Sequence, residues 1–160
     1  MTRAEDLAAT FEKTNDEVIA AVGACSDAQW RTTTQVERWP AAVVAHHIAI
    51  DHELIAGLAQ TIATGGTPPP LDMAALDQMN AEHAQKFANC TKAETLQILR
   101  DGGAKASATI RSLSDEQLDR TANLALMGGQ PVSAQQAIEN ILIGHPQGHL
   151  QSFRAATGQE

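Results

Sequence analysis

The sequence predicts an all-α protein in which four long helices form a bundle. Apolar residues recur at steps of three and four along four long stretches, which is the period of an amphipathic helix. Aromatic residues make up only 3% of the chain and Tyr is absent, whereas Ala and Leu are abundant. No stretch alternates convincingly with the period of a β-strand. We therefore expect one domain, residues 1–160.

The first helix is predicted from about Arg3 to Cys25. Its first turn carries a capping box, because Thr2 is followed three residues later by Glu5. A short helical turn, Ser26–Trp30, and a polar loop, Thr32–Arg38, are expected to follow it. The second helix is predicted to begin after Trp39-Pro40 and to run to about Thr64, where the Gly/Pro-rich stretch 65–70 ends it. The larger apolar residues of this helix, which should face the core, are Val44, Leu54, Ile55 and Leu58.

An additional short helix or crossover is expected between helices 2 and 3 of the bundle, from about Asp72 to Cys90. The candidates for its apolar side are Leu76, Met79, His83 and Phe87. Thr91 and Glu94 form another capping box, which opens the third bundle helix from Lys92 to about Leu113. From Asp119 to Val132 no clear period is present, and Met127–Pro131 is predicted to be a turn or a short hairpin.

The last helix is predicted from Ser133, which caps it together with Gln136, to Gly158, which ends it. One face of this helix collects its apolar residues and two histidines: Ile138, Leu142, His145, His149 and Phe153. Imidazole nitrogens in a buried stripe must find hydrogen-bond or metal partners. A metal ion bound by both histidines would satisfy this requirement.

A third histidine on the second helix is a candidate to complete this site. His47 falls on the same side as Val44 and Leu54, whereas His46 is rotated by about 100° from it and His52 is offset from both. Helix phase therefore selects His47, although the doubled His46-His47 leaves the register of the first ligand open. The predicted metal ligands are His47, His145 and His149, and three imidazoles with an open position form a site of the catalytic type. Imidazole suits Zn, Ni, Fe and Cu.

Other residues near these histidines have two interpretations each. Asp51 lies one turn after His47 and is either an outer partner of the metal ligands or a solvated helix charge. Glu53, Glu139 and Asn140 are expected at the surface, and the sequence names no general base. Pro146 predicts a kink that either aims His145 and His149 at one point or separates them, and we expect the first outcome.

Trp39 followed by His47 in WPAAVVAHHIA, together with His145 and His149 in GHPQGHLQSFRAA, resembles the DinB-like superfamily. This superfamily includes the metal-binding domain of mycothiol-dependent maleylpyruvate isomerase. The resemblance implies a four-helix bundle of up-down-down-up topology, a divalent metal on the three matching histidines, and frequent dimers. It also implies transferase or isomerase chemistry with a low-molecular-weight thiol such as mycothiol, bacillithiol or glutathione. The sequence departs from the pattern at Pro146 and lacks the C-terminal extension of the isomerase, so we do not expect maleylpyruvate isomerisation itself.

Composition restricts the partners. The net charge of −8 argues against nucleic acid or an anionic membrane as a partner. No apolar run approaches the roughly 20 residues of a membrane helix, and the two cysteines form no disulfide framework. We therefore expect a cytoplasmic protein that acts on a small molecule, and the resemblance implies a homodimer.

The most favoured function is a metal-dependent thiol S-transferase, with a divalent transition metal (Zn, Ni or Fe) as cofactor and a low-molecular-weight thiol as co-substrate. Two alternatives remain at this point: a metal-dependent hydrolase on the same scaffold, and a non-catalytic metal-binding protein of stress response or interaction.

Overall fold

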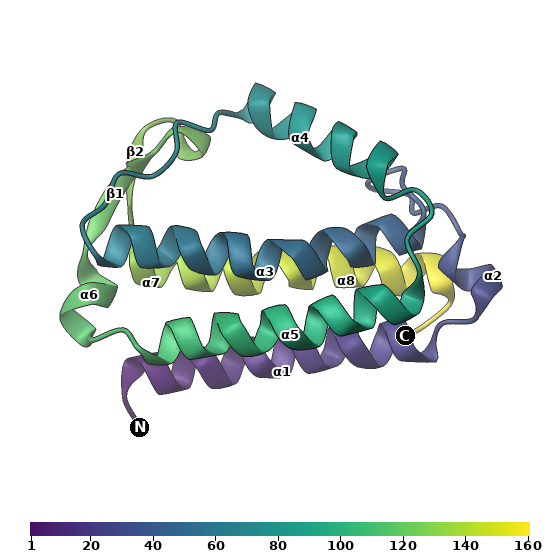
Figure 1. Cartoon of the computed structure of the whole chain (residues 1–160), viewed down its shortest axis with the longest axis horizontal. Coiled ribbons are helices and arrows are strands. Elements are labelled where there is room, and N and C mark those ends of the chain that lie inside the picture. Colours follow the sequence, from purple (N-terminus) through teal and green to yellow (C-terminus); the bar gives the residue numbers. More distant parts are fainter.

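Four long helical segments form the bundle in the computed structural model, which describes residues 1–160. They are α1 (Arg3–Ala24), α3 (Ala41–Ala63), α5 (Lys92–Arg111) and a composite last segment of α7 (Ala134–Gln136), η2 (Ala137–Ile143) and α8 (Gly144–Thr157). Figure 1 shows that α1 and the last segment run in one direction and α3 and α5 in the other. The predicted all-α bundle and its up-down-down-up topology are confirmed.

Short elements connect the bundle helices. Helix α2 (Asp27–Trp30) follows α1, and α4 (Met73–Lys86) is the predicted additional helix between the second and third bundle helices. After α5 come α6 (Asp115–Asp119), β1 (Thr121–Leu124), the short helix η1 (Ala125–Met127) and β2 (Gln130–Ser133). Strands β1 and β2 are antiparallel, with Thr121 opposite Ser133. The region without a clear period is therefore a small hairpin, the only sheet in the protein.

The predicted starts of three bundle segments, α1, α5 and α7, are correct because local hydrogen bonds fix them. Thr2, Thr91 and Ser133 all cap their helices, and each takes part in a reciprocal capping box with the residue three positions later. Gly158 ends α8 with a φ of 68°, a left-handed conformation that a residue without Cβ adopts at little cost.

The core divides into two clusters along the length of the bundle. One is centred on residues such as Phe11, Ile62 and Ile138, and the other on residues such as Val22, Leu99 and Phe153. Two residues that we expected on apolar, core-facing stripes lie outside it: Leu54 on α3 is 59% exposed and Met79 on α4 is 45% exposed. Helix α4 does not pack against the bundle along its length, so neither residue is covered.

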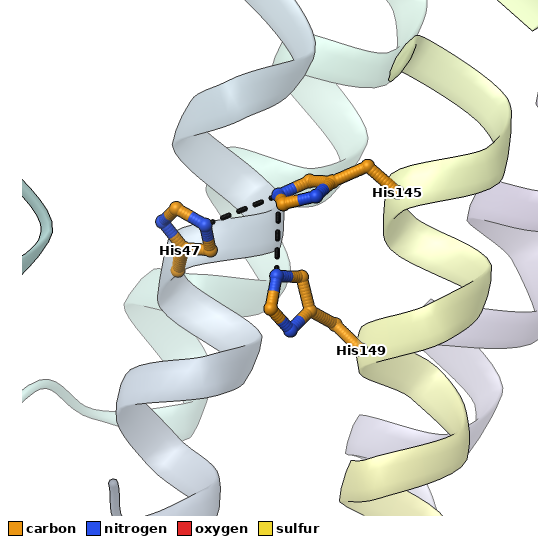
Figure 2. A group of neighbouring side chains, drawn as sticks. All are labelled: His47, His145 and His149. Atoms are coloured by element: carbon orange, nitrogen blue, oxygen red, sulfur yellow. Dashed lines mark hydrogen bonds between the residues drawn. The ribbon is translucent and has the colours of Figure 1, made fainter. Parts of the chain in front are cut away.

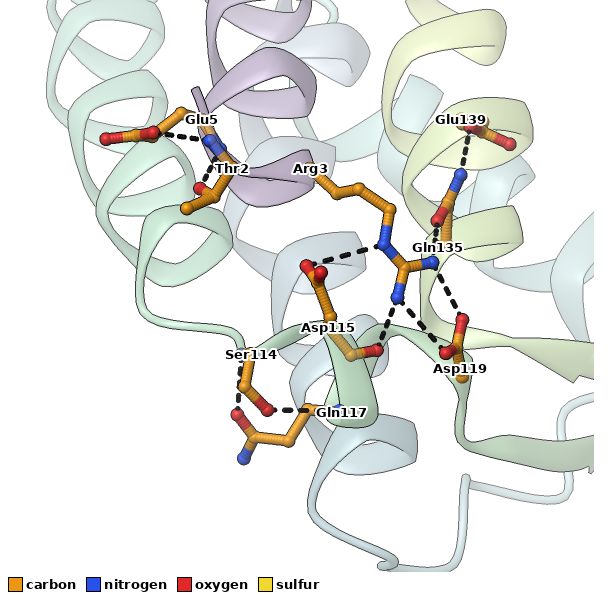
Figure 3. A network of polar contacts seen from close by, with 9 residues as sticks. All are labelled: Thr2, Arg3, Glu5, Ser114, Asp115, Gln117, Asp119, Gln135 and Glu139. Atoms are coloured by element: carbon orange, nitrogen blue, oxygen red, sulfur yellow. Dashed lines mark hydrogen bonds and ion pairs between the residues drawn. The ribbon is translucent and has the colours of Figure 1, made fainter.

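The start of α1 is tied to the end of the molecule that carries α6. The Arg3 guanidinium donates to Asp119 Oδ1 at 2.8 Å, to the Asp115 carbonyl at 2.7 Å and to Gln135 Oε1 at 3.0 Å (Figure 3). Ion pairs of this exposure contribute at most about 1 kcal/mol each. The network therefore orients α1 against α6 and the last segment more than it stabilises the fold. None of the helices has the length and apolar character needed to span a membrane.

Candidate metal centre

Three imidazoles meet between α3 and α8. Nε2 of His145 lies 3.2 Å from Nε2 of His47 and 3.2 Å from Nε2 of His149 (Figure 2). All three candidate ligand atoms lie within 4.8 Å of one another. Two ligands about 2.0–2.1 Å from one tetrahedral ion are about 3.3 Å apart, which matches the two shorter separations. Three nitrogens that face a common point need either shared protons or a cation between them. The donor set therefore fits a transition metal.

Helix phase determines which histidines take part. His47 on α3 faces α8, whereas the adjacent His46 points away from the cluster. The distance from His46 Nδ1 to Nε2 of His83 on α4 is 2.9 Å. The structure thus places His47, and not His46, beside His145 and His149. His52 is fully buried elsewhere, with its Nε2 2.8 Å from Oδ1 of Asn15.

The approach to His145 differs from the predicted kink. Residues Ala137–Ile143 form a π-helix, whose wider turn immediately precedes α8. Pro146 has no N–H group and its ring crowds the carbonyl one turn earlier, so a regular α-helix is disfavoured there. The π-helical turn takes up this conflict upstream of Pro146, and His145 and His149 remain on one face of α8. Such π-helical insertions are frequent at functional sites.

A carboxylate that could not be identified from the sequence forms a hydrogen bond with His149, at the ring nitrogen that does not face the other two histidines. Oε1 of Glu37 lies 2.7 Å from His149 Nδ1, and Ser152 donates a hydrogen bond of 2.5 Å to the other oxygen of Glu37. The Glu37 side chain is 8% exposed. With Nδ1 hydrogen-bonded to a carboxylate, Nε2 of His149 keeps its lone pair for the centre of the cluster. This is the usual arrangement of a carboxylate behind a metal-binding histidine.

The loop before α3 brings Glu37 into place. The Trp39 carbonyl accepts hydrogen bonds from the backbone N–H and the hydroxyl of Thr34, at 2.8 and 3.1 Å. Arg38 lies between Glu37 and Trp39 and has a φ of 61°, the only non-glycine residue with a positive φ. This conformation costs about 1–2 kcal/mol in an L-residue. It sets the direction of Glu37 and lets the Trp39 ring contact the edge of His47, with centroids 5.6 Å apart.

Asp51 faces the inside of the site. Its Oδ2 lies 3.2 Å from Nε2 of both His47 and His145, and the residue is buried. The interpretation as a solvated helix charge is therefore wrong. The carboxylate lies close to the same Nε2 atoms that would bind a metal. It is therefore next to the place where a further ligand of the ion would lie, and it does not hydrogen-bond to the outer nitrogen of a histidine as Glu37 does. Glu53, Glu139 and Asn140 are exposed, as predicted.

Burial favours the neutral form of the His47 and His149 imidazoles. Removal from water lowers the pKa of His47 to about 4, although the nearby Asp51 charge acts in the opposite direction. Burial also lowers the pKa of His149, and the hydrogen bond that His149 donates to Glu37 counteracts this shift in part. Burial tends to raise the pKa of Glu37, but the hydrogen bonds with Ser152 and His149 outweigh it, and the net shift is downward. Neutral imidazoles beside an ionised carboxylate are the protonation states that metal binding requires.

One family model matches most of the chain, and two solved structures share its fold. The model of the DinB superfamily matches residues 10–152. The structure of YfiT from Bacillus subtilis, described as a probable metal-dependent hydrolase with an unusual four-helix bundle topology, is similar with a TM-score of 0.77 and 17% identity. The match covers 100% of this chain and 91% of YfiT.

A mutant of the mycothiol-dependent maleylpyruvate isomerase is similar with a TM-score of 0.74 and 13% identity. This match covers 96% of this chain but only 63% of the isomerase. At these sequence identities, both structural similarities are evidence for a shared fold alone. No curated protein matches the sequence.

Proposed function

Because this chain belongs to the DinB superfamily, we propose that it is a metal-dependent enzyme whose ion is held by His47, His145 and His149. The observation that carries the proposal is the convergence of three Nε2 atoms, with separations of 3.2 Å from His145 to each of the other two. Two of these histidines come from α8 and one from α3, so only the folded bundle assembles the set. Glu37 fixes the orientation of His149 and Asp51 borders the remaining position.

We propose a low-molecular-weight thiol as the co-substrate. A divalent ion held by three neutral imidazoles supplies positive charge that lowers the pKa of a thiol or a water molecule beside it. Asp51 Oδ2 is placed to accept a hydrogen bond from the S–H group and so to orient the sulfur. In the transfer the proton of the thiol passes to solvent, an electron pair of sulfur forms a bond to an electrophilic carbon, and the leaving group departs with the electron pair of the bond that breaks. The comparison with a mycothiol-dependent isomerase supports this choice of co-substrate.

Hydrolysis by the same site is the second candidate. It is favoured by the similarity over the full chain to YfiT, described as a probable metal-dependent hydrolase. In this case water takes the place of the thiol next to Asp51. The two candidates share the metal ligands and differ only in the nucleophile. An assay of the reaction can therefore distinguish them, whereas the positions of the residues cannot.

Metal content tests the shared part of the proposal. Untagged protein from metal-replete growth is analysed for Zn, Ni, Fe and Cu by mass spectrometry, beside His149→Ala. We expect close to one ion per wild-type chain and loss of most of it in the variant, with an unchanged circular dichroism spectrum. Wild-type protein without a transition metal would eliminate both enzyme candidates. Unchanged metal content in His149→Ala would remove this residue from the site.

Thiol consumption separates the two candidates. Metal-loaded protein is incubated with mycothiol, bacillithiol or glutathione and a panel of electrophiles that includes epoxides, alkyl halides and activated alkenes. Loss of free thiol that depends on both protein and electrophile is expected for the transferase. Turnover of ester and amide substrates without thiol would identify the hydrolase instead. Parallel reactions with His149→Ala show which turnover comes from the site.

A further inference from the structure

Helix α4 is joined to the bundle in a way that no other long helix is. In Figure 1 it lies on the outer side of α3 and runs from near the middle of the bundle's length towards the end that carries α2. Of its 14 residues only His83 is buried. Met73 and Met79 are 56% and 45% exposed. A helix that packs on a core buries an entire stripe of side chains, and α4 buries one residue near its end.

The polar contacts of α4 lead to the same residue. Its N-terminal cap is formed by Asp72, and Gln78 bonds to Glu82 within the helix. The only hydrogen bond from residues 73–86 to the helices of the bundle joins His83 Nε2 to His46 Nδ1, at 2.9 Å, and no ion pair reaches the bundle. His83 Nδ1 is buried without a partner.

This attachment lies against the metal centre. The His83 ring is 5.5 Å from that of His47 and 6.4 Å from that of Trp39, between centroids. Phe87, just after α4, stacks on His46 at 4.1 Å. His47 is only 5% exposed. His83 thus covers a metal ligand from the side of α4.

Both ends of α4 allow it to move as a unit. Before it, the Gly/Pro-rich stretch 66–72 has no regular structure, and Gly65 has a φ of 77°. After it, a cavity of about 590 Å³ lies beside His46, Phe87 and Cys90. The chain is anchored again at Cys90, whose carbonyl accepts a hydrogen bond from the Trp30 indole. A helix with one attachment and irregular segments at both ends belongs to the part of a protein that opens locally.

We propose that α4 is a hinged arm that closes over the metal centre, and that His83 on His46 is its latch. Opening of the arm uncovers His47 and admits ligands from that side. His83 is a positioning residue in this device and does not bind the ion. The inference does not depend on the proposed function, because the arm can open whether or not a metal is present.

Hydrogen exchange on the metal-free full chain tests the latch directly. Three proteins are compared: wild type, His83→Ala, and Gln85→Ala as a control at an exposed position of the same helix. We expect α4 amides to exchange roughly 10-fold faster in His83→Ala than in wild type, with α3, α5 and α8 unchanged, and Gln85→Ala to equal wild type. Wild-type α4 amides that exchange as slowly as those of α5 would overturn the proposal, as would equal acceleration of all helices in His83→Ala.

Metal exchange distinguishes a latch from a ligand. Association of Ni²⁺ and its extraction by a chelator are followed by stopped flow on the same three proteins. A latch predicts that both rate constants rise by the same factor in His83→Ala, so that Kd stays constant. A weaker Kd with a faster release alone would make His83 part of the metal site and overturn the proposal. Rates equal to those of Gln85→Ala would also overturn it. Wild-type protein that binds no Ni²⁺ contradicts the proposed function, and hydrogen exchange then decides on the latch alone.

Discussion

Oε1 of Glu37 lies 2.7 Å from Nδ1 of His149, although 112 residues separate them in the sequence. The contact joins the loop before α3 to α8, and it sets which nitrogen of His149 faces the other two histidines. The same carboxylate accepts a hydrogen bond from Ser152, so both of its oxygens are used within the protein. The orientation of the site therefore depends on a residue outside the bundle helices.

Replacement of Glu37 by Gln tests this dependence. The amide keeps the size of the side chain but loses the charge that favours an Nδ1–H tautomer of His149. We expect Zn²⁺ or Ni²⁺ affinity to fall by roughly 10- to 100-fold, as is typical for outer partners of metal-binding histidines. Calorimetric titration measures the affinity. Glu53→Gln, at an exposed position on α3 that pairs with Lys105, is the matched control. Equal affinities for the two variants would exclude a role for Glu37.

The neighbours His46 and His47 give a second comparison. Both are buried histidines on α3, but only His47 faces His145. We expect His47→Ala to lower metal affinity by more than about 100-fold, because it removes a ligand and not merely an outer partner. His46→Ala should retain wild-type affinity at equilibrium. Metal content after dialysis against a weak chelator is the measurement. A greater loss in His46→Ala than in His47→Ala would assign the first ligand to His46.

The parts of the site that could be predicted are those that depend on local periodicity. His145 and His149 share a face because they are four residues apart, and the phase of α3 distinguishes His47 from His46. Capping boxes likewise predicted the starts of α1, α5 and α7, because they involve residues three positions apart. These features require only the geometry of one helix at a time.

The features that could not be predicted depend on contacts between distant segments. Glu37 reaches His149 from a loop in which the next residue, Arg38, has a left-handed conformation, and an arginine in the sequence does not indicate this conformation. Leu54 and Met79 fit apolar stripes, but they are exposed because α4 does not pack along α3. His83 was correctly placed on the apolar side of its helix, whereas its contact with His46 depends on how α4 crosses the bundle.

The buried His52 predicts a loss of stability in acid. Burial lowers the pKa of His52 from its ordinary value of 6.5 to about 4, and the Asp51 charge offsets this only in part. The unfolded chain therefore binds the proton at a higher pH than the folded protein. The contribution of His52 to the free energy of unfolding is complete above pH 6.5 and decreases as the pH falls towards 4. By about pH 5 the loss from this residue is about 2 kcal/mol.

Urea unfolding of the metal-free protein between pH 7.5 and pH 5 measures this effect. His46 and His47, whose pKa values burial also lowers to about 4, add to the loss in the wild type. His52→Gln cannot titrate but can still hydrogen-bond to Asn15. The free energy of unfolding should therefore depend less steeply on pH in this variant than in the wild type. Identical slopes would show that His52 does not link stability to pH.

Asn15 links three bundle helices, and Gly103 provides the space for it. Its side chain contacts His52 on α3 and donates to the Leu99 carbonyl on α5, at 2.8 and 3.0 Å. A Cβ at position 103 would lie 2.2 Å from Asn15 Nδ2, which is far closer than atoms can approach. Gly103→Ala should therefore displace Asn15 and leave buried polar groups unpaired, at a cost of about 2–4 kcal/mol.

Gly57→Ala on α3 is the matched control, because a Cβ there meets nothing within 4 Å. This substitution should stabilise the protein by up to about 1 kcal/mol through helix propensity. Chemical unfolding of the two variants beside the wild type gives the free energies of unfolding. We expect the two Gly→Ala changes to shift the free energy of unfolding in opposite directions, because an added Cβ would meet a neighbouring side chain only at position 103. A neutral or stabilising Gly103→Ala would mean that α5 can move away from α1 and that the Asn15 contacts contribute little to the fold.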